Sequence, residues 1–222
     1  MEMKVSVIIP TLNEENAIGK VLGDIPKGFV NEILVVDSST DGTAMIAKNL
    51  GANVISVARK GYGLALQTGV EKAKGEIVIY IDGDYTYDPK EMKRLVQPIL
   101  DGNYDVVLGN RLRGRMLPGS MSLLNRFGNI LLSLLFSILL FRKVGDTQCG
   151  FRAIRKRFLE EFSCISYGMP YVTEQLVKLV KKGARIGDVP VTYRPRIGET
   201  KLCAWTDGFK ILKVILKECF VL

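Results

Sequence analysis

Residues 4–108 alternate between short apolar runs and longer amphipathic segments, and this alternation constrains the fold more than any other feature of the chain. Continuous apolar runs of this length are typical of strands buried on both faces, and the segments between them are typical of helices. The pattern therefore predicts an α/β fold with a mostly parallel sheet and helices on both of its faces. The expected strands are Lys4–Ile9, Glu32–Asp37, Asn53–Val57, Glu76–Ile81 and Tyr104–Leu108, and the expected helices are Asn13–Leu22 (with Asn13 as the N-cap), Asp41–Leu50, Gly63–Lys74 and Pro89–Leu100.

The chain has 222 residues, a length that favours one hydrophobic core, so a single domain over residues 1–222 is expected. Its halves differ in character, because residues 1–110 carry the strand and helix alternation and residues 111–222 are richer in leucine and basic residues. The four cysteines form no C-x-x-C pair and histidine is absent, which argues against a structural zinc site. Free thiols in a reducing compartment, the cytoplasm, are expected.

Each of four expected strands runs directly into polar residues. These are Thr11 to Glu14, Asp37 to Ser39, Asp82 to Asp84, and Asn110 with Arg111. Ligands of open parallel sheets bind beyond the carboxyl ends of the strands. The sequence therefore predicts a binding site built from these four segments.

Asp82-Gly83-Asp84 is the most acidic of the four segments. Two carboxylates one residue apart suit Mg²⁺ or Mn²⁺, and such an ion neutralises the charge of a diphosphate leaving group. Gly83 would let the backbone approach a ligand closely. The alternative is a plain polar turn, because Asp and Gly are common turn residues.

The net charge of +8 predicts an anionic partner. Residues 106–145 contain no Asp or Glu, yet they hold Arg111, Arg113, Arg115, Arg126, Arg142 and Lys143. Basic residues mixed with leucine runs favour a membrane surface or a lipid phosphate, and no nucleic-acid partner is expected.

Two amphipathic helices are expected to lie on that membrane surface. Ser120–Phe141 gathers its polar residues in one narrow stripe, formed by Ser122, Asn125, Arg126, Asn129, Ser133 and Ser137. Its apolar part, residues 130–141, would reach about 18 Å as a helix, against about 30 Å for a bilayer core, so it does not span. Phe209–Leu222 would carry lysines on one face and Phe209, Leu212, Ile215, Leu216 and Phe220 on the other. Peripheral attachment to the cytoplasmic face of the membrane is expected, and Trp205 could be an interfacial anchor or part of the core.

The strand-end segments also belong to longer motifs. These are residues 5–15 (VSVIIPTLNEE), 35–43 (VVDSSTDGT), 60–65 (KGYGLA), 82–84 (DGD), 146–152 (DTQCGFR) and 198–202 (GETKL). In this order and spacing they resemble inverting family 2 glycosyltransferases of the GT-A fold over nearly the whole chain. The last two motifs resemble those of dolichyl-phosphate mannose and glucose synthases.

The resemblance implies a nucleotide-sugar-binding half (1–110) and an acceptor-binding, membrane-facing half (111–222). It implies donor binding by Pro10, Leu12, Glu14, Asp37, Lys60, Asp82, Gly83 and Asp84, and acceptor binding by Arg111, Arg126, Gln148, Arg196 and Lys201. The residues implied to take part in catalysis are Asp84, Arg111, Arg126 and Lys201. Asp82 and Asp84 would hold Mg²⁺ or Mn²⁺, and Thr86 stands where mannose synthases often carry a further ligand, a Gln. Glu174 stands where saccharide-extending relatives keep a catalytic Asp, and it could equally be a solvated or capping carboxylate, or orient Lys201 or Arg152.

The implied reaction transfers a hexose (glucose, N-acetylglucosamine or mannose) from a nucleotide-diphosphate sugar to dolichyl or polyprenyl phosphate, with inversion. Residues 146–151 look more like glucose-type members, which favours a UDP-linked donor. A lipid monophosphate has a second pKa of about 6 and needs no strong general base, in agreement with a chain without histidine. The alternatives are a glycosyltransferase that extends a saccharide or lipid-linked glycan, a nucleotidyltransferase, and a non-catalytic membrane-surface adaptor.

Overall fold

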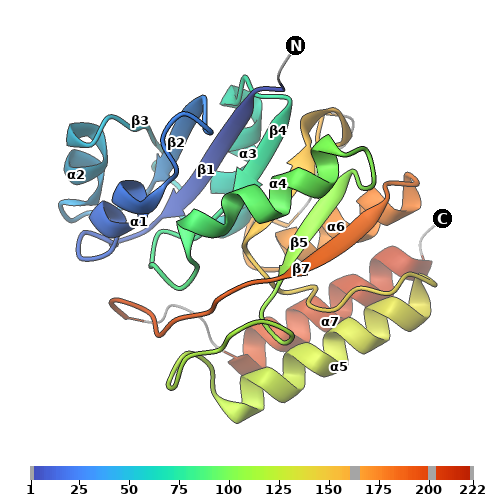
Figure 1. The fold of residues 1–222 in the computed structure, drawn as a ribbon. Coiled ribbons are helices and arrows are strands. Elements are labelled where there is room, and N and C mark those ends of the chain that lie inside the picture. Colours follow the sequence, from blue (N-terminus) through green and yellow to red (C-terminus); the bar gives the residue numbers. More distant parts are fainter. Residues whose placement is uncertain (1–2, 161–165, 200–203, 221–222) are drawn as a thin grey trace.

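The computed structural model describes residues 3–160, 166–199 and 204–220. Its centre is a seven-stranded sheet with the order β3-β2-β1-β4-β6-β5-β7 (Figure 1). All neighbouring strands are parallel except β6, which is antiparallel to both β4 and β5. The strands are β1 (Val5–Thr11), β2 (Glu32–Asp37), β3 (Asn53–Ser56), β4 (Ile77–Tyr80), β5 (Val106–Asn110), β6 (Arg152–Arg155) and β7 (Ile186–Pro190).

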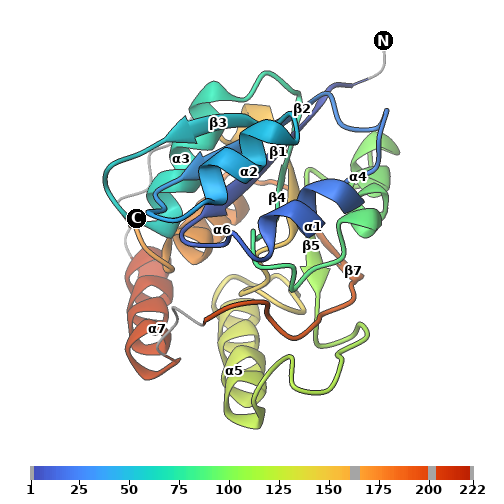
Figure 2. The same ribbon diagram turned by 90° about the vertical axis from the view of Figure 1, so that its left-hand side faces the viewer.

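Helices cover both faces of the sheet (Figures 1 and 2). Alternate residues of β1 enter two separate hydrophobic clusters, Val7 and Ile9 in one and Ile8 in the other. The first cluster includes residues of α1 (Ile18–Asp24), α2 (Thr43–Asn49) and α4 (Met92–Leu100), and the second includes residues of α3 (Tyr62–Lys72), α5 (Leu123–Leu139) and α6 (Tyr171–Lys181). The predicted α/β class with a mostly parallel, doubly covered sheet is confirmed.

The five expected strands are present, but β6 and β7 were not predicted. The β6 segment is only four residues long and has arginine at both ends, and β7 contains Gly187, Asp188 and Pro190. Neither segment is a continuous apolar run, so neither shows the pattern by which the other strands were predicted. Pairing with the rest of the sheet is what makes both segments strands.

The expectation that Asn13 is a helix N-cap is wrong. The α1 helix begins at Ile18 with Ala17 as its N-cap, and Asn13 lies before it with a φ of 53°. Asparagine tolerates this left-handed conformation better than most residues. The Asn13 side chain instead accepts a hydrogen bond from the backbone N–H of Thr40 (2.9 Å), which ties the end of β1 to the loop after β2.

The α5 helix turns part of its polar stripe towards the protein. Ser133 is buried and lies 3.2 Å from the Thr147 hydroxyl, and Ser137 Oγ accepts a hydrogen bond from the Val144 N–H. The opposite surface of α5 is apolar and exposed, with Phe127 65% and Leu131 55% accessible. Of the described residues, no helix is both long enough and apolar enough to cross a membrane.

The α7 helix (Ala204–Phe220) packs beside α5 and against α6 (Figures 1 and 2). Its Ile211 and Ile215 side chains are buried, so the expectation that Ile215 belongs to an outward-facing apolar surface is wrong. That surface consists of Phe209, Leu216 and Phe220, which are exposed. The difference arises because α7 needs an apolar side against the protein as well as one directed outward. The side chain of Trp205 lies outside the described residues.

Candidate active site

The carboxyl ends of β1 and β2 hold a hydrogen-bonded acidic group. Thr11 and Asp37 are direct neighbours in the parallel register, and the Thr11 hydroxyl donates to Asp37 Oδ1 at 2.6 Å. Ser39 donates to the same carboxylate from its hydroxyl (2.5 Å) and from its backbone N–H (3.2 Å). Asp37 is buried, and these hydrogen bonds hold its carboxylate in one orientation at the edge of the sheet where ligands of such folds bind.

The second acidic group follows β4, which pairs with β1. Asp82 Oδ1 accepts a hydrogen bond from the phenol of Tyr62 (2.8 Å), at the first residue of α3. Asp84 Oδ1 accepts two hydrogen bonds from Thr86, one from its hydroxyl (2.6 Å) and one from its backbone N–H (3.0 Å). In this arrangement Thr86 orients Asp84, and each carboxylate is fixed by a neighbour of its own.

The ionisation of Asp82 is perturbed by its surroundings. Burial and the negative charge of Asp84 raise the pKa of Asp82 to about 7, while the Tyr62 hydrogen bond and the charges of Arg196 and Arg111 act in the opposite direction. When a carboxyl group beside a second carboxylate resists ionisation, its surroundings contain too little positive charge to balance the two negative charges. A divalent cation would supply that charge, so the pair fits the Mg²⁺ or Mn²⁺ site that the sequence predicts.

Glycines allow neighbouring segments to pack closely around this pair. A Cβ atom on Gly83 would lie 2.8 Å from Thr11 Cγ2, so only glycine lets β1 and the Asp82–Asp84 segment approach this closely. A Cβ atom on Gly150 would lie 2.8 Å from Asp82 Oδ2. The turn that precedes β6 is therefore pressed against the acidic pair.

A strap formed by residues 193–198 crosses the site. Two backbone hydrogen bonds attach it to the segment after β4, from the Arg194 N–H to Thr86 O (2.8 Å) and from the Ile197 N–H to Asp84 O (3.1 Å). The guanidinium of Arg196 lies between two carboxylates: it pairs with Glu14, which follows β1, and with Asp84 Oδ2 at 3.2 Å. The C-terminal half thus contributes a cation directly to the acidic pair.

A second arginine lies beyond the end of β5. Arg111 is buried and forms a two-point ion pair with the fully buried Asp146, with Nε to Oδ2 at 2.7 Å and Nη2 to Oδ1 at 2.8 Å. Its guanidinium also lies over the Tyr193 ring, 5.1 Å from the centroid. Asp146 therefore fixes the direction of Arg111, and Tyr193 connects it to the strap.

The structure brings most of the predicted site residues to this edge of the sheet. Pro10 and Leu12 lie at the end of β1, and Lys60 is exposed in the loop just before α3. Gln148 lies in the turn before β6, where its amide oxygen accepts a hydrogen bond from Thr173 (3.3 Å). Lys201 lies outside the described residues.

Two predicted residues lie on helices and not at the strand ends. Arg126 is exposed on the first half of α5. Glu174 is buried in α6, where it accepts hydrogen bonds from the backbone N–H of Ser166 (2.9 Å) and from Lys178 Nζ (2.5 Å). These bonds give Glu174 a role in holding the segment around Ser166, while Arg152 donates to backbone carbonyl groups of residues 147, 149 and 172.

The sequence interpretation missed several residues that shape the site. Tyr62 lies within the motif at residues 60–65, but only Lys60 was assigned a role there. Arg194 cannot be recognised as a site residue from the sequence, because its contacts with Asp88 (2.5 Å) and the Tyr85 ring depend on the path of the strap. Among the residues that the structure describes, no three acidic, histidine or cysteine side chains gather as a complete metal cage. A metal ion held by Asp82 and Asp84 would therefore take its remaining ligands from substrate phosphate groups or water.

Solved structures show which class of protein has this fold. The chain resembles glucosyl-3-phosphoglycerate synthase of Mycobacterium tuberculosis, with a TM-score of 0.79 and 24% identity over 99% of this chain and 81% of that chain. The same enzyme has been crystallised with Mn²⁺, UDP and glucosyl-3-phosphoglycerate, and that structure gives a TM-score of 0.78. The fold is thus that of the GT-A glycosyltransferases.

The chain belongs to glycosyl transferase family 2, whose family model matches residues 6–163. It is 38% identical to a dolichyl-phosphate hexose transferase of Haloferax volcanii over 217 residues, which are 96% of this chain and 93% of the relative. It is also 35% identical to the low-salt glycan biosynthesis hexosyltransferase Agl6 of the same organism, over 95% of this chain but only 52% of that protein. The chain thus spans about half the length of Agl6 and nearly the whole length of the dolichyl-phosphate hexose transferase.

Proposed function

We propose that this glycosyltransferase moves a hexose from a nucleotide-diphosphate sugar to dolichyl or polyprenyl phosphate, with inversion at the anomeric carbon. The observation that carries the proposal is the near end-to-end similarity to a dolichyl-phosphate hexose transferase. The geometry supports it, because carboxylates from the first half of the chain and arginines from the second half meet at one edge of the sheet. A UDP-linked donor is the favoured form.

The donor side of the site consists of Asp37, Asp82 and Asp84. Asp37 is oriented at the end of β2, where it could accept hydrogen bonds from a base or ribose. Asp82 and Asp84 would hold Mg²⁺ or Mn²⁺, which when bound neutralises charge on the diphosphate. Lys60, exposed beside this edge, adds a cation for the same group.

The acceptor side needs cations rather than a base. A lipid monophosphate is largely ionised at pH 7, so its oxygen can attack the anomeric carbon without losing a proton. The bond from that carbon to the diphosphate oxygen breaks on the opposite face, and the nucleoside diphosphate leaves with the bonding electrons. Arg111, fixed by Asp146, and Arg196 on the strap would hold the two anionic substrates together.

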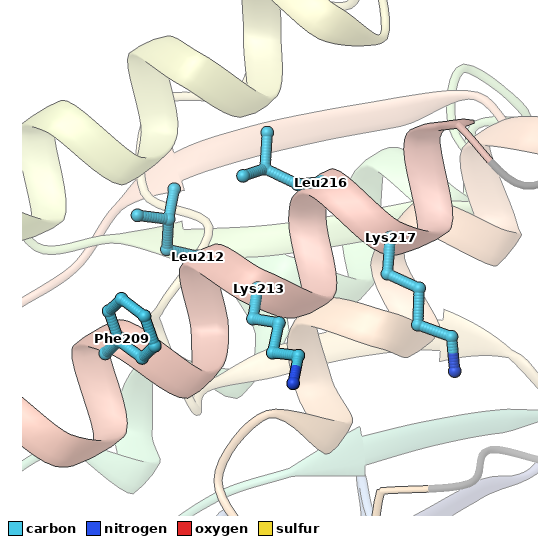
Figure 3. A pocket seen from close by; sticks show the side chains of 5 residues that line it. All are labelled: Phe209, Leu212, Lys213, Leu216 and Lys217. Carbon is cyan, nitrogen blue, oxygen red and sulfur yellow. The ribbon is translucent and has the colours of Figure 1, made fainter.

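We further propose that the exposed apolar surface of α5 and α7 rests on the cytoplasmic face of a membrane. The outward residues of α5 are Leu123, Leu124, Phe127, Ile130, Leu131, Leu134 and Ile138. On α7, Phe209, Leu212 and Leu216 line an open groove together with Lys213 and Lys217, and Figure 3 shows the lysines pointing away from the leucines. Apolar side chains beside lysines are typical of helices that lie at the headgroup level of anionic lipids.

The reaction can be tested by incubating the protein with Mn²⁺, dolichyl phosphate and labelled UDP-hexoses or GDP-mannose. We expect label to become extractable into organic solvent, to depend on the metal, and to be lost in Asp84→Asn. The control Asp101→Asn changes an exposed carboxylate at the end of α4 and should keep full activity. Label that enters a soluble saccharide and never the lipid would contradict the proposal.

Flotation with liposomes that contain anionic lipid tests the membrane surface. We expect the wild-type protein to float with the vesicles and the double variant Phe127→Asp, Leu131→Asp to stay behind. Met45→Asp is the matched control, because Met45 is equally exposed (64%) but lies on α2. Equal flotation of all three proteins would contradict attachment through α5.

A further inference from the structure

We propose that Arg196 competes with the divalent cation for Asp84 and moves to the donor diphosphate when metal and nucleotide bind. Arg196 would then act twice, first as a substitute cation and later as a ligand for phosphate. This inference rests on the proposed function only for the identity of the metal and the diphosphate.

The first observation is the position of the guanidinium. Asp84 Oδ1 is occupied by the two donors of Thr86, and the other oxygen, Oδ2, faces Arg196 Nη1 at 3.2 Å. Oδ2 is the oxygen that a metal ion would need. Arg196 thus already supplies part of the charge that a metal would supply.

The second observation is an unused donor. Arg196 Nε is buried and has no hydrogen-bond partner among the described residues. A buried N–H without an acceptor is destabilising, so such groups usually have a partner in the working state of a protein. A phosphate oxygen would satisfy this N–H, because guanidinium groups bind phosphate through two parallel hydrogen bonds. In its position beside Asp84, Arg196 therefore leaves one of its hydrogen-bond donors unused.

The third observation is the way the strap is attached. The Arg194 and Ile197 N–H groups fix the backbone on both sides of Arg196 to the segment after β4. The side chain can consequently leave Asp84 while its backbone stays beside the site. A guanidinium and a divalent cation repel each other at the same carboxylate oxygen, so the ion must displace Arg196. The nearest new negative charge is then the diphosphate that enters with the metal.

Binding of Mn²⁺ alone, followed by electron paramagnetic resonance of the free ion, tests this exchange. We expect Arg196→Gln to bind Mn²⁺ more tightly than the wild type in the absence of nucleotide, by about tenfold for a removed competitor worth about 1.4 kcal/mol. In the presence of saturating Mn²⁺ the same variant should bind UDP or GDP, whichever the wild type prefers, several times more weakly. If Arg196 had only a structural role, Arg196→Gln would weaken the binding of Mn²⁺ and the binding of the nucleotide alike.

Two further variants complete the test. Arg194→Gln changes the neighbouring strap arginine, which binds Asp88 and Tyr85, and should leave the affinity for Mn²⁺ alone within about twofold of the wild type. Arg196→Lys keeps the positive charge and should bind Mn²⁺ less tightly than Arg196→Gln. Unchanged or weaker Mn²⁺ binding in a folded Arg196→Gln protein overturns the inference. Because this titration needs neither sugar nor lipid, a failure of the proposed transfer reaction would be seen separately.

Discussion

Replacing Asp82 with asparagine should make the metal-free protein more stable while removing its ability to bind metal. In the folded chain, burial and the Asp84 charge raise the pKa of Asp82 from an ordinary 3.8 to about 7. The folded state therefore holds the proton more tightly than the unfolded chain does. The contribution of Asp82 to stability is fully present below about pH 4 and is lost as the pH rises through about 7.

The size of the effect follows from the same pKa. At about 1.36 kcal/mol for each pH unit, the ionised Asp82 costs at most about 4 kcal/mol at pH 8. Because the side chain keeps some contact with solvent, about half of this, about 2 kcal/mol, is the better expectation. An asparagine keeps the oxygen that accepts the Tyr62 hydrogen bond but carries no charge. For a chain of this length, about 2 kcal/mol corresponds to about 4–8 °C in Tm.

Urea unfolding with EDTA present, followed by circular dichroism at pH 8 and pH 4, measures this difference. We expect Asp82→Asn to exceed the wild type by about 2 kcal/mol at pH 8 and by under about 1 kcal/mol at pH 4. Added Mn²⁺ should stabilise the wild type and not the variant. Asp101→Asn serves as the control that shows no such pH dependence. A variant that is no more stable than the wild type at pH 8 would refute the conclusion that the acidic pair lacks positive charge.

Three further substitutions test other contacts of the site. Asp146→Asn leaves Arg111 buried without its partner charge and should lower the free energy of unfolding by about 3–5 kcal/mol, measured by urea unfolding; a loss below about 1 kcal/mol would contradict the buried pair. Tyr62→Phe removes the hydrogen bond that orients Asp82 and should weaken Mn²⁺ binding severalfold in a protein with unchanged circular dichroism, whereas equal affinity would show that this bond is dispensable. Gly150→Ala places a methyl group 2.8 Å from Asp82 Oδ2 and should abolish Mn²⁺-dependent nucleotide binding, as measured by calorimetry. Its control, Gly23→Ala, adds a methyl group that meets nothing within 4 Å and should bind normally.

The sequence was sufficient to predict the order and type of the main elements. Continuous apolar runs such as residues 77–81 can form only buried strands or buried helices, and their short length between turn residues decides for strands. The position of Asp82 and Asp84 follows directly, because polar residues after a parallel strand lie at its carboxyl end. These inferences depend on local pattern alone, which is why they agree with the structure.

The sequence was not sufficient for features that depend on partners far along the chain. The β7 strand has no apolar run and exists through its pairing with β5. The direction in which Ile215 points depends on the packing of α7 against α6, since several rotations of an amphipathic helix satisfy the same pattern. The contact of Arg196 with Glu14 joins residues that lie 182 positions apart.

Strand periodicity and the direction of parallel strands are therefore enough to predict the α/β class, the edge of the sheet that holds the candidate site, and the position of Asp82 and Asp84 at that edge. The tertiary structure alone decided which cations face that pair, and that Thr86 and Tyr62 orient its two carboxylates. Hydrogen bonds and ion pairs act over a few ångströms in space, and separation along the chain does not reveal which groups come that close.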